Sequence, residues 1–572
     1  MACRKISFSM RFPPLIVAVG DHFKSRVAVR WRNGAIRVAG RSPSRSAALY
    51  QAAIDRTVAP PGKRGRPPGP HRGVDRFVVD RPLTWAGLAR IAGREARLEL
   101  SPEAEARIEA AHAIVLAIVA RNIRAYGVNT GVGALSDVII PGDQLGALSR
   151  NILMSHAVGI GAPLAAPETR AMMAATVNNF AHGHSGLRLM VVERIIDLLN
   201  ADCLPVIPRQ GSVGYISHRA HIGLALIGQG AVVLEGVRMP ATEALGRLGL
   251  EPLVLEAKEG LCLVNGSACA AGLAALAVDR ARHILDWADA VSAMTFETQG
   301  CQLSAIAPAA MALRVSTGLA QVTARLNALL SGSGILSAAA GRRTQDALSL
   351  RGIPQVHGAA RDVWTQVADV VDRELASSTD NPAILGSPES PEVFSQAHPM
   401  GAAVGLAMDQ LSTAMAQIGM ISERRLDRMV NPLVSGLPAF LARSGGVESG
   451  FMIAQYAAAA LAAENRRLAA PASLDGGVTS GLQEDMLCHP TSAALKALDI
   501  LANARTIIAI ELLAACQSYD LLDRDLTPAP GTAALYRALR RRIGPYADDR
   551  PLADDIAGAV AFTDEHTPDA IA

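Results

Sequence analysis

The 572-residue sequence has few aromatic residues, little charge and no cysteine motif. Aromatic residues make up 4% of the chain and charged residues 19%, whereas half of it is hydrophobic. No apolar run reaches the roughly 18 residues that a membrane-spanning helix needs, and the first residues lack the apolar core of a signal peptide. Seven cysteines without a CxxC pair indicate neither a disulfide framework nor a zinc site. These absences predict a soluble, cytoplasmic protein that does not bind membranes.

Motifs for nucleotide or metal chemistry are also lacking. No GxGxxG, P-loop or HExxH sequence occurs in a context that would support such chemistry. His182 and His184 have the spacing of only two ligands. We therefore expect no bound metal and no nucleotide cofactor.

Basic residues are concentrated at the N-terminus. Residues 1–75 hold 15 Lys/Arg against 3 Asp/Glu, and residues 76–572 hold 40 against 49. The Pro/Gly/Arg-rich stretch 58–70 cannot bury apolar surface, which predicts a disordered or polyproline-like linker. Within it, residues 64–67 resemble the core of an AT-hook, but a single copy favours a solvated linker over nucleic-acid binding. Alternating apolar and basic positions in residues 4–45 fit a short hairpin, an over-long start or a targeting tail.

From about residue 77 the sequence has the periodicity of helices. Apolar residues recur at helical spacing in residues 102–122, 267–295 and 402–422. Short strands are expected near residues 77–79 and 232–234, and Gly/Pro turns join the remaining helices. The predicted fold class is mainly α.

Several polar and glycine-rich motifs follow one another in this helical part. They are Tyr126-Gly-Val-Asn-Thr-Gly-Val-Gly133, Asn151-Ile-Leu-Met-Ser-His-Ala-Val-Gly-Ile-Gly161, Lys258-Glu-Gly-Leu-Cys-Leu-Val-Asn-Gly266, Gln345-Asp-Ala-Leu-Ser-Leu-Arg-Gly-Ile-Pro-Gln-Val-His-Gly358 and Gln483-Glu484-Asp485. A further run, Gly211-Ser-Val-Gly-Tyr-Ile-Ser-His-Arg-Ala-His-Ile222, fits G-S-V-G-A-S-G-D-L-x-P-L-x-H through Gly214 and again at His221, with a gap of three residues between them. Through these motifs, residues 77–520 resemble the histidine and phenylalanine ammonia-lyases. These enzymes cyclise Ala-Ser-Gly into an electrophile, 4-methylidene-imidazol-5-one (MIO).

The resemblance implies a fold and an assembly. It implies the fumarase/aspartase-like ammonia-lyase fold, with a long central helical bundle and a smaller N-terminal active-site domain. We accordingly expect a basic extension over residues 1–76 that is disordered in part, an active-site domain over 77–290 and a helical bundle over 291–572. Family members form homotetramers whose active sites combine residues of three subunits, so isolated monomers should be inactive.

The same resemblance assigns candidate catalytic residues. Tyr126 is the candidate base for the β-proton, because a phenol can take a proton where nearby cations or dipoles lower its pKa. Asn265 lies beside MIO and the substrate amine in the family pattern, and Gln345 belongs to the same catalytic set. An ordinary turn at Tyr126 and a helix cap at Asn265 are the structural alternatives.

Substrate-binding residues follow from the remaining motifs. His156 is typical of the histidine-specific branch, Glu484 could pair with an imidazole or ammonium, and Arg351 would clamp the carboxylate. A structural histidine, a helix N-terminal charge and a structural ion pair are the respective alternatives. Two positions depart from the family: Leu348 replaces a tyrosine, and His398 lies in a segment that has lost an aromatic residue and an asparagine.

The junction between Gly214 and Tyr215 is the largest departure, because the Ala-Ser-Gly tripeptide belongs there. Ordinary side chains supply nucleophiles and bases rather than electrophiles, so elimination of ammonia depends on MIO. Either a mature MIO, condensed into one modified residue, does not appear in the standard letters, or the gene lacks the three residues.

The first interpretation predicts an ammonia-lyase that converts an aromatic L-amino acid, with L-histidine to urocanate as the expected reaction, through MIO and a tyrosine base. The second predicts a homologue without MIO that is catalytically silent or acts on a substrate with a better leaving group. A 2,3-aminomutase is a further alternative, since it would use the same electrophile and base.

Overall fold

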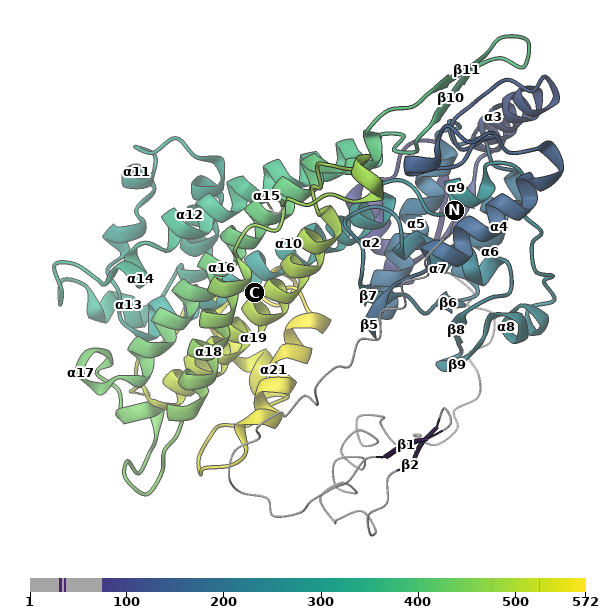
Figure 1. Ribbon diagram of the computed structural model, residues 1–572. Helices are drawn as coiled ribbons and strands as arrows, with labels where there is room; N and C mark the ends of the chain where they lie inside the picture. Colours follow the sequence, from purple (N-terminus) through teal and green to yellow (C-terminus); the bar gives the residue numbers. More distant parts are fainter. Residues whose placement is uncertain (1–29, 33–34, 38–74, 475, 524) are drawn as a thin grey trace, which may run out of the picture. The chain divides into compact units, whose positions relative to one another are not determined.

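The computed structural model describes residues 30–32, 35–37 and 75–572, except residues 475 and 524 (Figure 1). In the basic extension, β1 (Arg30–Arg32) pairs antiparallel with β2 (Ala35–Arg37), which confirms the predicted hairpin. The linker and the AT-hook-like run lie outside the described residues, so those expectations stay predictions.

The part of the chain that follows residue 73 begins with two parallel strands joined by a helix. Strand β3 (Asp75–Val79) pairs with β4 (Ala96–Leu100), and α2 (Trp85–Ala92) connects them. Helix α3 (Pro102–Ala120) begins at Ser101, whose side chain accepts a hydrogen bond from the Ala104 N–H. The strand expected near residue 77 and the helix expected from residue 102 are both confirmed.

Short strands and helices make up the region up to residue 267. The strands are β5 (Ile160–Pro163), β6 (Leu204–Pro205), β7 (Pro208–Gln210), β8 (Ala231–Leu234) and β9 (Val237–Pro240). The helices are α4 (Leu145–His156), α5 (Ala166–Ala181), α6 (Leu189–Asn200), α7 (His218–Leu226), α8 (Ala241–Arg247) and α9 (Glu259–Cys262). Strand β8 is the one predicted near residue 232, and it pairs with β6 and β9.

Four long helices form the core of the molecule. They are α10 (Ala268–Thr298), α15 (Ile353–Leu375), α16 (Ala402–Val430) and α19 (Pro490–Leu521). They pack side by side in Figure 1, with most of α10 and α19 buried on every side. Small residues permit this packing: a Cβ on Gly272 of α10 would lie 2.5 Å from the Ala171 carbonyl oxygen of α5. The mainly α prediction is confirmed.

Shorter elements surround these helices. The helices are α11 (Pro308–Met311), α12 (Thr317–Leu330), α13 (Gly334–Ala339), α14 (Leu348–Arg351), α17 (Pro432–Ser435), α18 (Met452–Leu468), α20 (Pro530–Arg540) and α21 (Leu552–Glu565). Strands β10 (Ala383–Gly386) and β11 (Pro391–Phe394) form an antiparallel hairpin. The domain boundary expected at residue 290 falls inside α10 and stays a prediction. Among the described residues, no helix has both the length and the apolarity to cross a membrane.

A fully buried ion pair links two of the core helices. The Arg425 guanidinium of α16 donates to both carboxylate oxygens of Glu511 of α19, at 2.6 and 2.8 Å. The hydroxyls of Thr295 and Ser422 donate to the same carboxylate. Four donors therefore compensate the desolvation of one buried negative charge.

Replacing Arg425 by methionine should lower the free energy of unfolding by about 3–5 kcal/mol, because it leaves the Glu511 charge buried without its cation. Urea denaturation of the purified variant measures this change. Adding Glu511→Gln should recover part of the loss. Arg373→Met, which removes an exposed partner of Asp369, should cost less than about 1 kcal/mol. Equal losses for the two arginine variants would contradict this account.

Candidate functional site

A cavity of about 740 Å³ lies where loops from distant parts of the chain meet. Five of the residues selected from the sequence line it together: Tyr126, His156, Tyr215, Asn265 and Glu484. They come from five separate segments, between residues 126 and 484, so only the fold brings them together. This convergence is the basis for treating the cavity as the candidate active site.

The loop that carries Tyr126 is held in one conformation by its own polar groups. The Asn129 side chain donates to the Ile123 carbonyl and accepts from the Ala125 N–H. Gly127 has a φ of 62°, and a Cβ there would lie 2.1 Å from Leu261 Cδ2, so glycine is required. The Gly133 N–H donates to the Tyr126 hydroxyl oxygen at 3.2 Å. That donor would stabilise negative charge on the phenol oxygen.

His156 and Glu484 are two of the polar residues that line the cavity. His156 ends α4, and its Nδ1 lies 3.0 Å from the Ser155 hydroxyl. Burial lowers the pKa of His156, and the Glu484 charge offsets part of that shift. The imidazole is therefore neutral at neutral pH and can donate or accept a hydrogen bond. The Thr479 hydroxyl donates to Glu484 at 2.8 Å and holds the carboxylate in place.

Asn265 is fixed by contacts within the protein. Its Nδ2 donates to the Asn381 carbonyl at 2.7 Å, and its Oδ1 accepts from the Gly266 N–H. The helix-cap alternative is wrong, because Ser267 is the N-cap of α10, and Asn265 lines the cavity. One amide N–H remains for a ligand.

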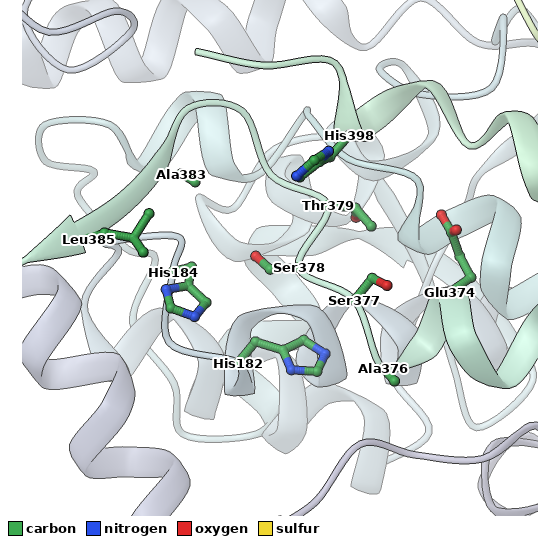
Figure 2. A pocket seen from close by; sticks show the side chains of 10 residues that line it. All are labelled: His182, His184, Glu374, Ala376, Ser377, Ser378, Thr379, Ala383, Leu385 and His398. Atoms are coloured by element: carbon green, nitrogen blue, oxygen red, sulfur yellow. The ribbon is translucent and has the colours of Figure 1, made fainter. Parts of the chain in front are cut away.

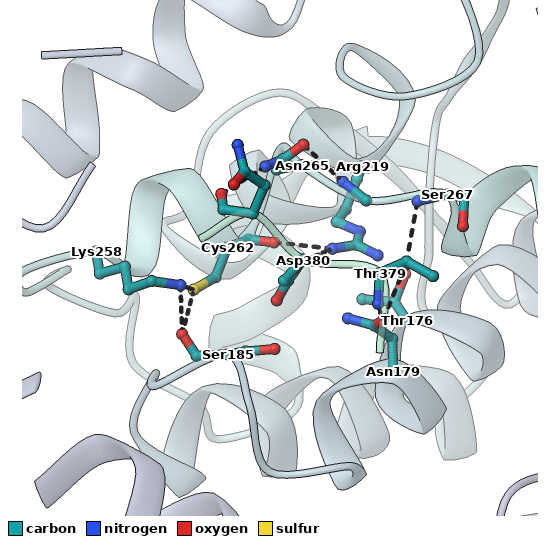
Figure 3. Close-up of polar contacts among 12 residues, drawn as sticks. Thr176, Asn179, Ser185, Arg219, Lys258, Cys262, Asn265, Ser267, Thr379 and Asp380 are labelled. Carbon is teal, nitrogen blue, oxygen red and sulfur yellow. Dashed lines mark hydrogen bonds and ion pairs between the residues drawn. The ribbon is translucent and has the colours of Figure 1, made fainter. Parts of the chain in front are cut away.

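A buried polar cluster lies next to Asn265 (Figure 3). The Lys258 ammonium donates to the Ser185 carbonyl and to Cys262 Sγ. The Arg219 guanidinium donates to the Cys262 carbonyl and to Asp380, with both charged side chains 1% exposed. These contacts join the 258–266 segment to the segment that follows the Gly214 junction.

The junction itself forms a closed turn. The Ser212 hydroxyl donates to the carbonyls of Tyr215 and Ile216 at 3.1 and 3.0 Å, and it accepts from the Gly214 N–H. The Thr491 hydroxyl, at the start of α19, donates to the Gly214 carbonyl. Gly214 has a φ of 125°, and a Cβ there would lie 2.1 Å from Pro490 Cδ. The turn is therefore anchored both within itself and to a core helix.

Beyond the turn, the backbone is strained. Ile216 and Ser217 have φ values of 64° and 65°, a region that β-branched and bulky residues rarely adopt. The Tyr215 side chain, in a residue only 7% exposed, faces the cavity beside Glu484. Burial and then the Glu484 charge raise the pKa of Tyr215 well above its ordinary value. Tyr215 is thus a neutral phenol.

The residues at this junction do not fit MIO. Ala-Ser-Gly occurs nowhere in the 572 residues. Ser217, on one side of the junction, is followed by His218 where the family has glycine. Ser212, equally near on the other side, lies between Gly211 and Val213, so cyclisation around it would require a β-branched valine at that position. Its hydroxyl is already occupied by the turn. The proposed elimination therefore has no step that involves MIO.

The other selected residues lie outside the cavity. Gln345, Leu348 and Arg351 precede or form α14, which contacts α15 and α16, and Leu348 is 70% exposed. His398 lines a different pocket of about 520 Å³, together with His182, His184 and Glu374 (Figure 2). Its neighbours Pro399 and Met400 line the candidate site. Within one chain, these four residues are separate from Tyr126.

One functional position was missed by reasoning from sequence. Asn381 lines the cavity, and its carbonyl holds the Asn265 side chain. The segment that holds it, Ser378-Thr-Asp-Asn-Pro382, is not among the motifs selected from the sequence. The available signal was a run of five polar residues, 377–381, before a proline in a mainly apolar helical protein.

Comparison with known proteins is consistent with this geometry. The family described as aromatic amino acid lyase matches residues 83–541, which is most of the chain. The chain belongs to the aromatic amino acid lyase family.

A curated member named histidine ammonia-lyase, from Symbiobacterium thermophilum, is 44% identical over 477 residues, covering 83% of this chain and 94% of its own. Among solved structures, histidine ammonia-lyase from Trypanosoma cruzi is 37% identical with a TM-score of 0.79, covering 86% of this chain and 93% of its own. Tyrosine aminomutase from Streptomyces globisporus is 34% identical with a TM-score of 0.82, covering 87% and 98%. Lyases and aminomutases of this family thus share the fold of this chain.

His218, just after the junction, should make the protein sensitive to acid. Burial lowers the pKa of His218 to about 4, while the nearby backbone of Pro208 and Arg209 offsets part of the shift. Because the unfolded chain takes up the proton first, stability is lost as pH falls below about 6.5, by up to about 3 kcal/mol near pH 4. His218→Leu should weaken this dependence in melting curves recorded between pH 7 and 4. An unchanged acid dependence would contradict the assignment.

Proposed function

We propose that the protein is a carbon–nitrogen lyase that acts on an imidazole-bearing α-amino acid and gives an α,β-unsaturated acid. For L-histidine the product would be urocanate. The observation that carries the proposal is the convergence of Tyr126, His156 and Glu484 on one cavity. The relatives named histidine ammonia-lyase, at up to 44% identity, support the choice of histidine.

Tyr126 acts as the base in this proposal. Its oxygen accepts the proton from Cβ, and the C–H electron pair forms the double bond as the Cα–N bond breaks. The Gly133 N–H, 3.2 Å from that oxygen, stabilises the anionic form that accepts the proton. The neutral phenol of Tyr215 cannot share this role at neutral pH, because burial keeps it protonated.

His156 and Glu484 bind the substrate ring. A neutral His156 exchanges one hydrogen bond with an imidazole, and the Glu484 carboxylate accepts from the other ring N–H. Substrates with a phenyl ring would leave both groups unpaired in a partly buried site. We expect the ring to be selected by this pair.

Arg351 would hold the substrate carboxylate from a neighbouring subunit. It does not line the cavity of its own chain, and the same is true of Gln345. We propose a homotetramer in which α14 of one subunit completes the site of another, as the family resemblance implies. A bidentate guanidinium then fixes the Cα–Cβ bond for elimination.

Tyr126→Phe should lower kcat by at least about 100-fold, because the base takes up the proton in the transition state and its removal raises the activation barrier. Tyr456→Phe, at a tyrosine of α18 that is 61% exposed, is the matched control and should keep full activity. The ultraviolet absorbance of the unsaturated product measures both rates. An active Tyr126→Phe enzyme would exclude Tyr126 as the base.

Subunit mixing tests the shared site. Chains with Tyr126→Phe and chains with Arg351→Met should each be inactive when expressed alone. Co-expression should restore activity, because some sites of a mixed tetramer combine an intact Tyr126 with an intact Arg351 from another subunit. If both residues acted within one chain, the mixture would stay inactive, and size-exclusion chromatography would confirm that mixed tetramers had formed.

A further inference from the structure

We propose that the cavity lined by His182, His184, Glu374 and His398 binds a short aliphatic diammonium cation. This cavity has a volume of about 520 Å³, and none of the described residues that line it also lines the candidate active site. It lies where the ends of α5 and α15 meet strand β10 (Figure 2). The inference goes beyond the proposed function, because it concerns a different cavity and a different ligand.

Two histidines of the cavity present hydrogen-bond acceptors. His182 Nε2 lies 3.0 Å from the Leu375 carbonyl oxygen, and His184 Nδ1 lies 3.2 Å from the Ile384 carbonyl oxygen. A carbonyl only accepts, so in a neutral imidazole each of these ring nitrogens carries the proton. Burial lowers the pKa of His182, which keeps that ring neutral at neutral pH. The other nitrogen of each ring is then an acceptor, and it has no hydrogen-bond partner among the described residues.

Glu374 adds a carboxylate to these acceptors. The Ser267 hydroxyl donates to it at 2.5 Å and occupies one of about four acceptor positions. Burial raises the pKa of Glu374, because the charged form loses solvation that the protein does not fully replace. No Lys or Arg is among the described residues that line this cavity. A cation bound there would stabilise the charged carboxylate.

The carbonyl ends of two helices lie at the same cavity. Helix α5 ends at Ala181 and α15 ends at Leu375, and the residues that follow them, His182 and Ala376, line the cavity. The C-terminus of a helix carries partial negative charge and favours a cation. The Arg107 guanidinium lies near His182, but it donates to the Ala181 carbonyl and does not line the cavity. The helix ends therefore add to the negative character of the cavity.

The remaining lining residues indicate the shape of the ligand. The Ser378 hydroxyl oxygen is buried and has no hydrogen-bond partner among the described residues, so it is free to accept from an ammonium group. Figure 2 shows Ser378 between His184 and Glu374, and Ala383 and Leu385 contribute apolar surface. A primary ammonium has three N–H donors for such acceptors. Acceptors on different sides, together with apolar surface, fit an ammonium group at each end of a methylene chain.

Equilibrium dialysis of the full-length protein against labelled 1,4-diaminobutane tests this inference. We expect saturable binding of the diamine. 1,4-Butanediol has the same carbon chain without the charges, so we expect it not to bind at the same concentrations. Equal binding of the two compounds would indicate a neutral polar cavity and would overturn the proposal. Absence of diamine binding would also overturn it.

Two substitutions in the cavity locate the site. Glu374→Gln removes the charge and keeps an acceptor for Ser267, and we expect it to raise the Kd of the diamine at least about tenfold. Ser378→Ala should raise the Kd about threefold. It should leave the melting temperature unchanged, because the hydroxyl has no partner in the described protein to lose. Unchanged affinity in either variant would overturn the proposal.

Two matched controls test other carboxylates of the chain. Glu389→Gln changes an exposed side chain beyond β10, and Glu484→Gln changes the candidate active site. We expect neither substitution to change the Kd of the diamine. A loss of affinity in Glu484→Gln equal to that in Glu374→Gln would show that the cation is not specific to this cavity, and would overturn the proposal.

Discussion

The turn that joins Gly214 to Tyr215 determines what the rest of the site can do. Ser212 closes it with three hydrogen bonds, and Thr491 attaches it to the start of a core helix. Its closure places a phenol beside Glu484 and leaves no Ala-Ser-Gly from which an electrophile could form. In the proposed function, Tyr126 is the base and His156 with Glu484 binds the ring, so activation of the leaving group must differ from that by MIO.

The core helices and the candidate site differ in the kind of structure that builds them. The long helices are joined by buried charges whose partners are complete, such as Arg425 with Glu511 and Arg361 with Asp289. The cavity is built instead from loops, and strain is concentrated there at Ile216 and Ser217. Strained backbone persists only where surrounding packing enforces it. The core helices thus maintain a loop geometry that would not be stable by itself.

Much of the fold could be predicted from local sequence. Helices starting near residues 102, 268 and 402 follow from apolar spacing, because periodicity reports which face is buried. The motifs around Tyr126, His156 and Glu484 indicated a common site through family resemblance. Long-range pairing was not predictable: the contact of Arg219 with Asp380 joins residues 161 positions apart. The exposure of Leu348 depends likewise on packing that one sequence does not encode locally.

The absence of the electrophile is the central claim, and the mass of one peptide tests it most directly. Trypsin cleaves after Arg209 and Arg219, so the peptide 210–219 spans the junction. We predict the mass of the ten unmodified residues in that range. A peptide heavier by about 180 Da, the increment of a cyclised and dehydrated Ala-Ser-Gly, would show that MIO is present and would contradict the account.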